Sequence, residues 1–110
     1  MSQSRQLAAI MFTDMVGYTA LMQQNESLAV QQRDKSKKIL EDALANYEGK
    51  LLQYYGDGTL SVFSSALNAV KSSIEIQTLN RSKKIEMRIG IHTGDVMFDD
   101  TAIYGDSVNV

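Results

Sequence analysis

The sequence predicts an α+β fold of the ferredoxin-like type, a βαββαβ two-layer sandwich with an antiparallel sheet and helices on one face. An apolar run over residues 7–12 stops at Thr13-Asp14, which indicates a strand end. Two helical patterns then flank a strand–turn–strand segment, and residues 85–91 alternate between apolar and polar side chains. We expect one domain over residues 1–110, because no linker or repeat interrupts the chain.

The first half of the chain predicts a buried strand and a helical segment. Residues 7–12 (Leu-Ala-Ala-Ile-Met-Phe) are too short for an isolated helix and indicate a strand buried on both faces. Asn25 is a typical N-cap, so we expect a short helix before a long one that ends at Gly49. The long helix has one apolar stripe: Ile39, Leu40, Ala43, Leu44 and Tyr47.

The second half predicts a hairpin, a helix and a last strand. Residues 50–55 and 59–64 are strand-like and are joined by Gly56-Asp57-Gly58, a hairpin signal. The next helix is expected over residues 66–79. Its predicted inward residues are Leu67, Val70 and Ile74. The alternating strand that starts at residue 85 is expected to bend at Thr93-Gly94 and to continue over residues 96–98.

Composition excludes several classes of protein. The formal net charge is −2 and the pI about 5.3, so no basic surface indicates binding to nucleic acid. Without cysteine, the chain has no disulfides and no thiolate metal site. The N-terminal apolar segment is too short for a signal peptide or a membrane span, so we expect a cytoplasmic protein.

Two aspartates, Asp14 and Asp57, suggest a metal–phosphate site. Asp14 ends the first strand and precedes a turn, Val16 to Thr19, whose backbone N–H groups lead into a helix N-terminus that could bind phosphate. In a ferredoxin-like sheet the first and third strands are neighbours, so the hairpin tip that carries Asp57 should lie close to Asp14. Two carboxylates beside phosphate oxygens suit magnesium.

Each of these residues also has a purely structural interpretation. Asp57 could serve only turn chemistry and Asp14 only helix capping. Arg88 could be a salt-bridge partner or a phosphate ligand. His92, the single histidine, is interpreted as a packed or hydrogen-bonded strand residue.

At these positions the sequence resembles the class III nucleotidyl cyclases, the adenylate and guanylate cyclase family. The similar segments, in the family's order, are residues 12–19 (FTDMVGYT), 56–58 (GDG), 88–96 (RIGIHTGDV) and 104–109 (YGDSVN). The resemblance runs from about Arg5 to the last residue. It implies the cyclase core fold and conversion of a nucleoside triphosphate to a 3',5'-cyclic nucleotide and pyrophosphate, in cyclic-nucleotide signalling.

The resemblance also implies roles for individual residues. Asp14 and Asp57, with the Met15 carbonyl, would bind two Mg²⁺ or Mn²⁺ ions, and Arg88 would assist the phosphates. Triphosphate-binding positions would be Met15, Val16, Gly17, Tyr18 and Thr19. Asn109 would orient the ribose from a partner subunit, because family members work as head-to-tail dimers.

Two base-reading positions depart from the family. The adenine-selecting lysine of the family corresponds to Gln53 and its usual aspartate partner to Ala102. Glutamine can still hydrogen-bond a base edge, whereas alanine cannot. Because neither purine-selecting pair of the family is intact, ATP is expected only by default, with GTP as the less favoured substrate. A diguanylate cyclase is disfavoured, because Gly56-Asp57-Gly58-Thr59-Leu60 does not supply the hairpin motif of that class.

The family's transition-state arginine would follow four residues after Asn109, beyond Val110. Loss of such a cation costs on the order of a thousand-fold in rate, so we expect the 110-residue chain alone, as the major N-terminal part of a cyclase domain, to be inactive or poorly active. The alternative hypothesis is a non-catalytic nucleotide-binding or dimerisation module.

Overall fold

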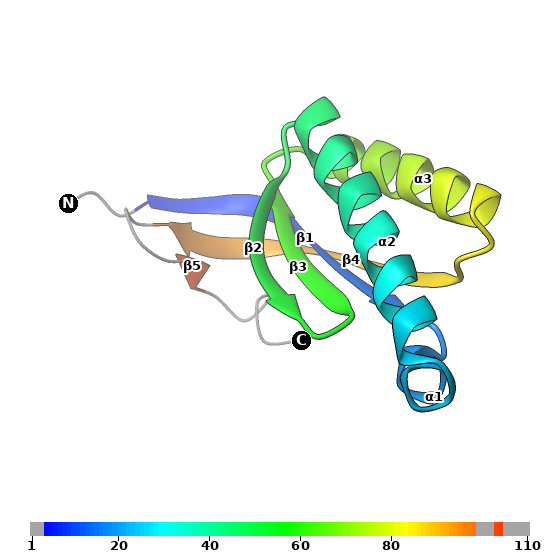
Figure 1. Cartoon of the computed structure of the whole chain (residues 1–110). Coiled ribbons are helices and arrows are strands. Elements are labelled where there is room, and N and C mark those ends of the chain that lie inside the picture. The colour runs from blue at the N-terminus through cyan, green and yellow to red at the C-terminus, as the bar shows by residue number, and fades with distance from the viewer. Residues whose placement is uncertain (1–3, 99–102, 105–110) are drawn as a thin grey trace.

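The computed structural model describes residues 4–98 and 103–104 (Figure 1). Its elements follow the predicted order and add one short strand at the end. They are β1 (Ser4–Met15), α1 (Tyr18–Gln24), α2 (Glu26–Asn46), β2 (Lys50–Tyr55), β3 (Gly58–Phe63), α3 (Ala66–Ser82), β4 (Met87–Phe98) and β5 (Ile103–Tyr104). The described helices include none that is long and apolar enough to cross a membrane.

The strands form one antiparallel sheet in the order β2-β3-β1-β4-β5. β1 lies between β3 and β4, which confirms the ferredoxin-like prediction that the first and third strands are neighbours. Residues 8–11 of β1 are all buried, as expected for a central strand with an apolar run. β4 pairs with β1 without interruption from Met87 to Phe98, so the predicted bend at Thr93-Gly94 is wrong.

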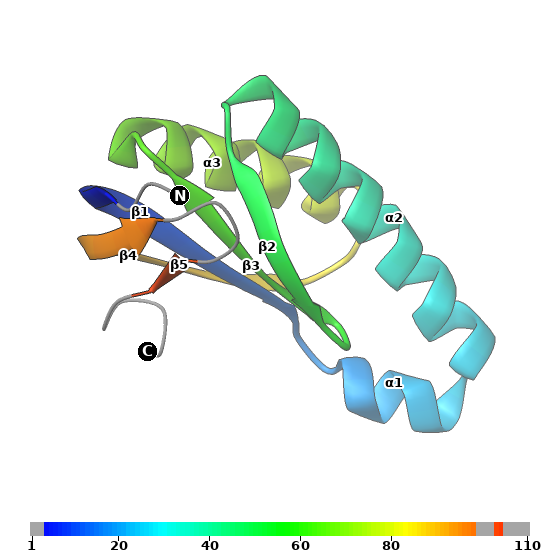
Figure 2. The ribbon, with the colours of Figure 1, turned by 90° about the vertical axis from the view of Figure 1, so that its left-hand side faces the viewer.

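Helices α2 and α3 cover one face of the sheet, and α1 lies beyond the end of β1 (Figure 2). The main core forms between these helices and the sheet. It contains Ala9, Met11, Ile39, Leu40, Ala43, Leu44, Phe63, Ala69 and Ile76. The predicted apolar stripe of α2 is therefore confirmed, with Tyr47 partly buried at its end. Asn25 caps α2 as predicted, because its side chain accepts a hydrogen bond from the Leu28 N–H at 3.1 Å.

The other face of the sheet carries a second apolar cluster. Its buried members are Ala8, Ile10, Leu60, Val62 and Val96, with Phe12 and Leu52 partly buried beside them. Along β1, therefore, odd-numbered residues face the helices and even-numbered residues face the opposite side.

The predicted inward face of α3 is wrong. Leu67, Val70 and Ile74 are exposed, whereas the buried stripe is Ala69, Ser72, Ile76 and Asn80. Both stripes have helical spacing, so the pattern alone does not decide between them. The buried stripe consists mostly of smaller side chains, which allow the helix to approach the sheet closely, and Asn80 donates a hydrogen bond to the Ile76 carbonyl at 2.9 Å.

The end of α2 also differs from the prediction in detail. The helix ends at Asn46, and the left-handed residue after it is Glu48, with φ 59°. Gly49 is needed for space rather than for backbone conformation. A Cβ atom there would lie 2.5 Å from the buried ring of Phe63.

Candidate functional site

The end of β1 and the tip of the β2–β3 hairpin meet at one edge of the sheet. Thr13 is the register partner of Thr59 on β3, and Asp14 is the partner of Arg88 on β4. These residues border an open groove of about 560 Å³. Its lining residues are Phe12, Thr13, Asp14, Tyr55, Asp57, Gly58, Arg88, Ile89 and Gly90. The structure thus brings Asp14, Asp57 and Arg88 together, as the sequence predicted for the two aspartates.

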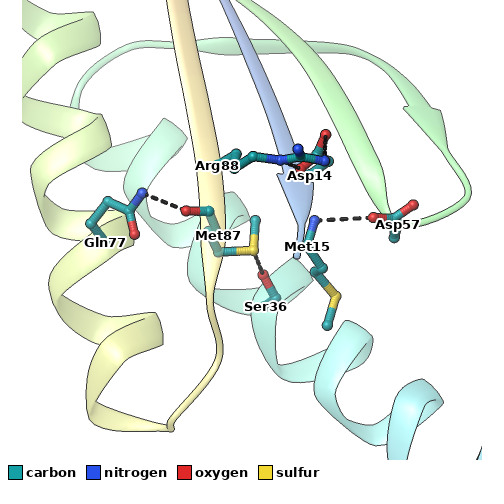
Figure 3. A network of polar contacts seen from close by, with 7 residues as sticks. All are labelled: Asp14, Met15, Ser36, Asp57, Gln77, Met87 and Arg88. Atoms are coloured by element: carbon teal, nitrogen blue, oxygen red, sulfur yellow. Dashed lines mark hydrogen bonds and ion pairs between the residues drawn. The ribbon is translucent and has the colours of Figure 1, made fainter. Parts of the chain in front are cut away.

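Arg88 holds the carboxylate of Asp14 in a two-point ion pair. Its Nε lies 2.8 Å from Oδ1 and its Nη2 3.2 Å from Oδ2 (Figure 3). The two side chains are 72% and 44% exposed, respectively, so water screens the pair. The hydrogen bond to Asp14 raises the pKa of Arg88, and the charge of Asp57 adds to this effect. Of the two interpretations of Arg88 that the sequence left open, the structure therefore shows the salt-bridge partner.

Asp57 is fixed by the backbone of β1. The Met15 N–H donates a hydrogen bond to its Oδ2 at 3.0 Å, which ties the hairpin tip to the strand end (Figure 3). Beneath it, the hydroxyls of Thr13 and Thr59 form a buried hydrogen bond of 2.6 Å. Gly58 permits this close approach, because a Cβ atom there would lie 2.6 Å from the Thr13 carbonyl oxygen.

The turn after β1 has fewer available N–H groups than predicted. The Val16 N–H donates to the Glu86 carbonyl at 3.0 Å, so it does not point to a ligand. Gly17 then adopts the left-handed conformation, with φ 73°, and α1 begins at Tyr18. The N–H groups that remain for an anion are those of Gly17, Tyr18 and Thr19, because the first residues of a helix have no intrahelical acceptor.

Arg88 is oriented by contacts that sequence reasoning missed. The preceding residue, Met87, accepts hydrogen bonds from both long helices: the Ser36 hydroxyl lies 3.4 Å from its Sδ, and the Gln77 Nε2 lies 2.9 Å from its carbonyl oxygen (Figure 3). Ser36 is 51 positions away in the sequence, and no local pattern indicates this contact. These bonds fix the start of β4 and therefore the position of Arg88.

A second cavity of about 280 Å³ lies on the helix side of the hairpin. It shares Thr13, Met15, Asp57 and Gly58 with the region of the aspartates and adds residues of α2 and β2, among them Arg33, Lys37 and Tyr54. The Nζ of Lys37 lies 4.7 Å from the ring centre of Tyr54. Burial, followed by a hydrogen bond to Glu41, raises the pKa of Tyr54 to about 12. Arg33 and Lys37 are four residues apart on α2, and this spacing is the sequence signal that could have indicated a basic helix face lining the cavity.

The positions predicted to read the base are separate from the aspartates or lie outside the described residues. Gln53 is exposed on the edge strand β2 and pairs with Leu60, which places it on the face opposite the helices. Strand β3 separates it from Asp14. Ala102 and Asn109 lie outside the described residues. His92, on β4, is exposed rather than packed.

The donor set fits magnesium or manganese bound together with a nucleotide. Within residues 4–98 and 103–104, no group of three or more His, Cys, Asp or Glu side chains could hold a metal alone. Mg²⁺ in triphosphate sites typically takes one or two carboxylates and fills the other positions with phosphate oxygens and water. Asp14 and Asp57, on one groove, match that pattern.

Comparisons with known proteins agree with this fold. No family model matches the chain. A curated protein of Rhizobium meliloti (strain 1021), named "Putative adenylate cyclase 3", is 36% identical over 96% of the chain, which spans 20% of that protein's length. A solved adenylate/guanylate cyclase/hydrolase from Silicibacter pomeroyi is 34% identical, with a TM-score of 0.81 over 98% of this chain and 68% of that one. The adenylyl cyclase CyaB from P. aeruginosa shares the fold at 21% identity, with a TM-score of 0.84 over 99% of this chain and 70% of that one.

Proposed function

The chain belongs to the class III adenylate and guanylate cyclase family, and from this premise we propose that it forms a 3',5'-cyclic nucleotide and pyrophosphate from a nucleoside triphosphate, ATP in preference to GTP. The observation that carries the proposal is the position of Asp14, Asp57 and Arg88 on one groove beside the start of α1. Two carboxylates and one guanidinium in this arrangement suit a triphosphate with divalent cations.

Asp14, Asp57 and the Met15 carbonyl would hold two Mg²⁺ or Mn²⁺ ions. Such ions, when bound, neutralise phosphate charge and favour attack by the ribose 3'-hydroxyl on the α-phosphate. Asp57 is suited to this role because the Met15 N–H occupies only its Oδ2 at 3.0 Å and fixes the orientation of the carboxylate. Asp14 projects from the next strand toward the same groove.

The phosphates would be held by Arg88 and by the turn after β1. The Arg88 guanidinium can donate two parallel hydrogen bonds to a phosphate, as it does to the Asp14 carboxylate. The N–H groups of Gly17, Tyr18 and Thr19 add partial positive charge at the start of α1. Met15 and Val16 contribute by fixing this turn, through bonds to Asp57 and Glu86.

We further propose that a second copy of the chain supplies the base and ribose contacts in a head-to-tail homodimer. Gln53 lies on the exposed edge strand, with β3 between it and Asp14, so it is better placed to read the base of a neighbouring site than of its own. Ala102 would stand beside the base in the same partner subunit, and Asn109 would orient the ribose there. With Gln53 and Ala102 as its base-reading pair, the site should discriminate weakly between purines.

The test is formation of cyclic AMP or cyclic GMP by the longest natural form of the protein that contains this chain, with Mg²⁺ or Mn²⁺. Asp14→Asn and Asp57→Asn should each reduce kcat about a thousand-fold or more, with an unchanged circular dichroism spectrum. Asp42→Asn is the matched control, because Asp42 is exposed on α2 and pairs only with Lys38 among the described residues. Absence of cyclic nucleotide from both substrates with both metals would contradict the proposal.

The same assay addresses the second candidate, a non-catalytic nucleotide-binding or dimerisation module. Gln53 and Ala102, in place of the family's base-reading pair, favour this candidate. Calorimetric binding of ATP or GTP without turnover would support it over the cyclase.

A further inference from the structure

Both oxygens of Asp14 are engaged by Arg88, at 2.8 and 3.2 Å. The two residues are direct register partners on β1 and β4, so the sheet itself holds them opposite each other. Among the described residues that line the groove, Arg88 is the only basic one. From this geometry we propose that Arg88 is an internal counter-cation of Asp14, which a divalent cation must displace and which a triphosphate draws away. The inference rests on the metal site of the proposed function.

A guanidinium in this position and a metal ion compete for the same carboxylate oxygens. Mg²⁺ binds carboxylate oxygens at about 2.0–2.1 Å, which would put the ion against the N–H groups that now contact the same oxygens. Two cations at such a short separation also repel each other. Arg88 must therefore move before a metal ion can take the lone pairs of Asp14 that its N–H groups now occupy.

The pair can be displaced because it is weakly held. The Arg88 side chain is 72% exposed and that of Asp14 44%, and exposed ion pairs contribute little net stability. A triphosphate offers Arg88 a more highly charged acceptor with matching two-point geometry. Asp57 differs from Asp14 in this respect, because among the described residues it accepts its hydrogen bond from the Met15 N–H and not from a basic side chain.

It follows that metal and triphosphate assist each other. Binding of the polyanion removes Arg88 from Asp14 and so prepares the metal site. Binding of the metal frees Arg88 for the phosphates. Linkage requires the two effects to be equal, and couplings of this kind are typically about 5–150-fold in affinity.

The first experiment measures Mn²⁺ binding in the absence of nucleotide, by electron paramagnetic resonance, at about 0.15 M salt. Arg88→Gln should bind Mn²⁺ about tenfold more tightly than the unaltered chain, because Asp14 no longer has a competing cation. Lys38→Gln is the matched control. It removes the cation of an exposed pair, 2.9 Å from Asp42 on α2, and should stay within about twofold of the unaltered chain. Equal or weaker Mn²⁺ binding by Arg88→Gln would overturn the inference.

The second experiment measures binding of inorganic tripolyphosphate by calorimetry, with all divalent cations chelated. Asp14→Asn should bind it about tenfold more tightly, because Arg88 is free from the start. Asp57→Asn controls for the loss of one negative charge in the same groove and should gain much less. An equal gain in both variants would overturn the inference, because net charge alone would then explain it.

These outcomes are distinct from failure of the proposed function. If cyclic nucleotide is formed but Arg88→Gln leaves Mn²⁺ affinity unchanged, the cyclase activity stands and the counter-cation role is wrong. If no cyclic nucleotide is formed but both affinity gains appear, the counter-cation role stands and the activity is wrong. If no variant binds Mn²⁺ without nucleotide, the counter-cation role is wrong, and the cyclase assay alone decides the activity.

Discussion

Replacing Gly58 with alanine tests how closely β3 must approach β1 beside the two aspartates. An added Cβ atom would lie 2.6 Å from the Thr13 carbonyl oxygen, 0.8 Å short of the 3.4 Å at which ordinary van der Waals contact begins. The obstacle is backbone in the central strand, so no side-chain rotation can relieve it. Relief requires β1 and β3 to separate locally.

The expected cost combines two effects. Overpacking in a tightly packed region costs about 1–3 kcal/mol. Separation of the strands would also weaken the buried hydrogen bond between the Thr13 and Thr59 hydroxyls, 2.6 Å long, which adds about 1 kcal/mol. We therefore expect Gly58→Ala to lower the free energy of unfolding by about 2–4 kcal/mol. For a domain of this size, that corresponds to a fall in Tm of roughly 8–16 °C.

The assay is thermal unfolding followed by circular dichroism, with Gly90→Ala as the matched control. Gly90 lies on β4 in the same groove, and an added Cβ there meets nothing within 4 Å. Alanine is better than glycine in a strand by about 0.5–1 kcal/mol, so this control should be neutral or slightly stabilising. Manganese affinity gives a second readout, because a shifted hairpin tip breaks the 3.0 Å bond from the Met15 N–H to Asp57.

The reasoning is refuted if Gly58→Ala and Gly90→Ala unfold within about 2 °C of each other. Such a result would mean that the hairpin moves without cost and that the close approach at Gly58 does not position Asp57. If Gly58→Ala lost stability but kept its Mn²⁺ affinity, the strand contact would be structural only.

Three further predictions concern the helices and the edge strand. Asn25→Ala should lower the free energy of unfolding by about 1 kcal/mol in denaturant melts through loss of the α2 cap, and an unchanged midpoint would contradict this. In the same melts Ile76→Ala should cost about 2–5 kcal/mol and Ile74→Ala less than about 0.5, because only Ile76 is buried; the reverse order would contradict the orientation of α3. In an ultraviolet absorbance titration Tyr54 should ionise near pH 12, and Glu41→Gln should move its pKa toward 10. Stability should then fall as pH rises from 10 to 12, because the unfolded chain releases the Tyr54 proton first. A Tyr54 phenol that titrates near 10 in the folded chain, identified by its loss in Tyr54→Phe, would contradict the prediction.

Much of the fold could be predicted from the sequence, because each strand carries its own pattern. The apolar run before Asp14 predicts a central strand, and the Gly56-Asp57-Gly58 turn predicts the hairpin. These elements together predict the strand order, and the strand order predicts that the two aspartates lie close together. The buried face of α3 could not be predicted, because two stripes of equal spacing compete and the surface of the sheet decides between them.

Contacts between distant segments could not be predicted from the sequence either. Arg88 and Asp14 are 74 positions apart, and the sequence left open whether Arg88 pairs with a carboxylate or a phosphate. The Val16 N–H was expected to be free and instead bonds to Glu86, because β4 begins directly beside the turn. Both outcomes depend on the exact register of β1 and β4, which no local pattern specifies.

That register links the core to the chemistry of the groove. Met11, Thr13 and Met15 point into the helix side of β1, so the alternation of the strand directs Asp14 to the opposite face, toward Arg88. A slip of one residue would turn Asp14 toward the helices and away from Arg88. Burying the charged carboxylate of Asp14 against the main core costs free energy and opposes any such slip. The register of β1 therefore determines which face carries the carboxylate.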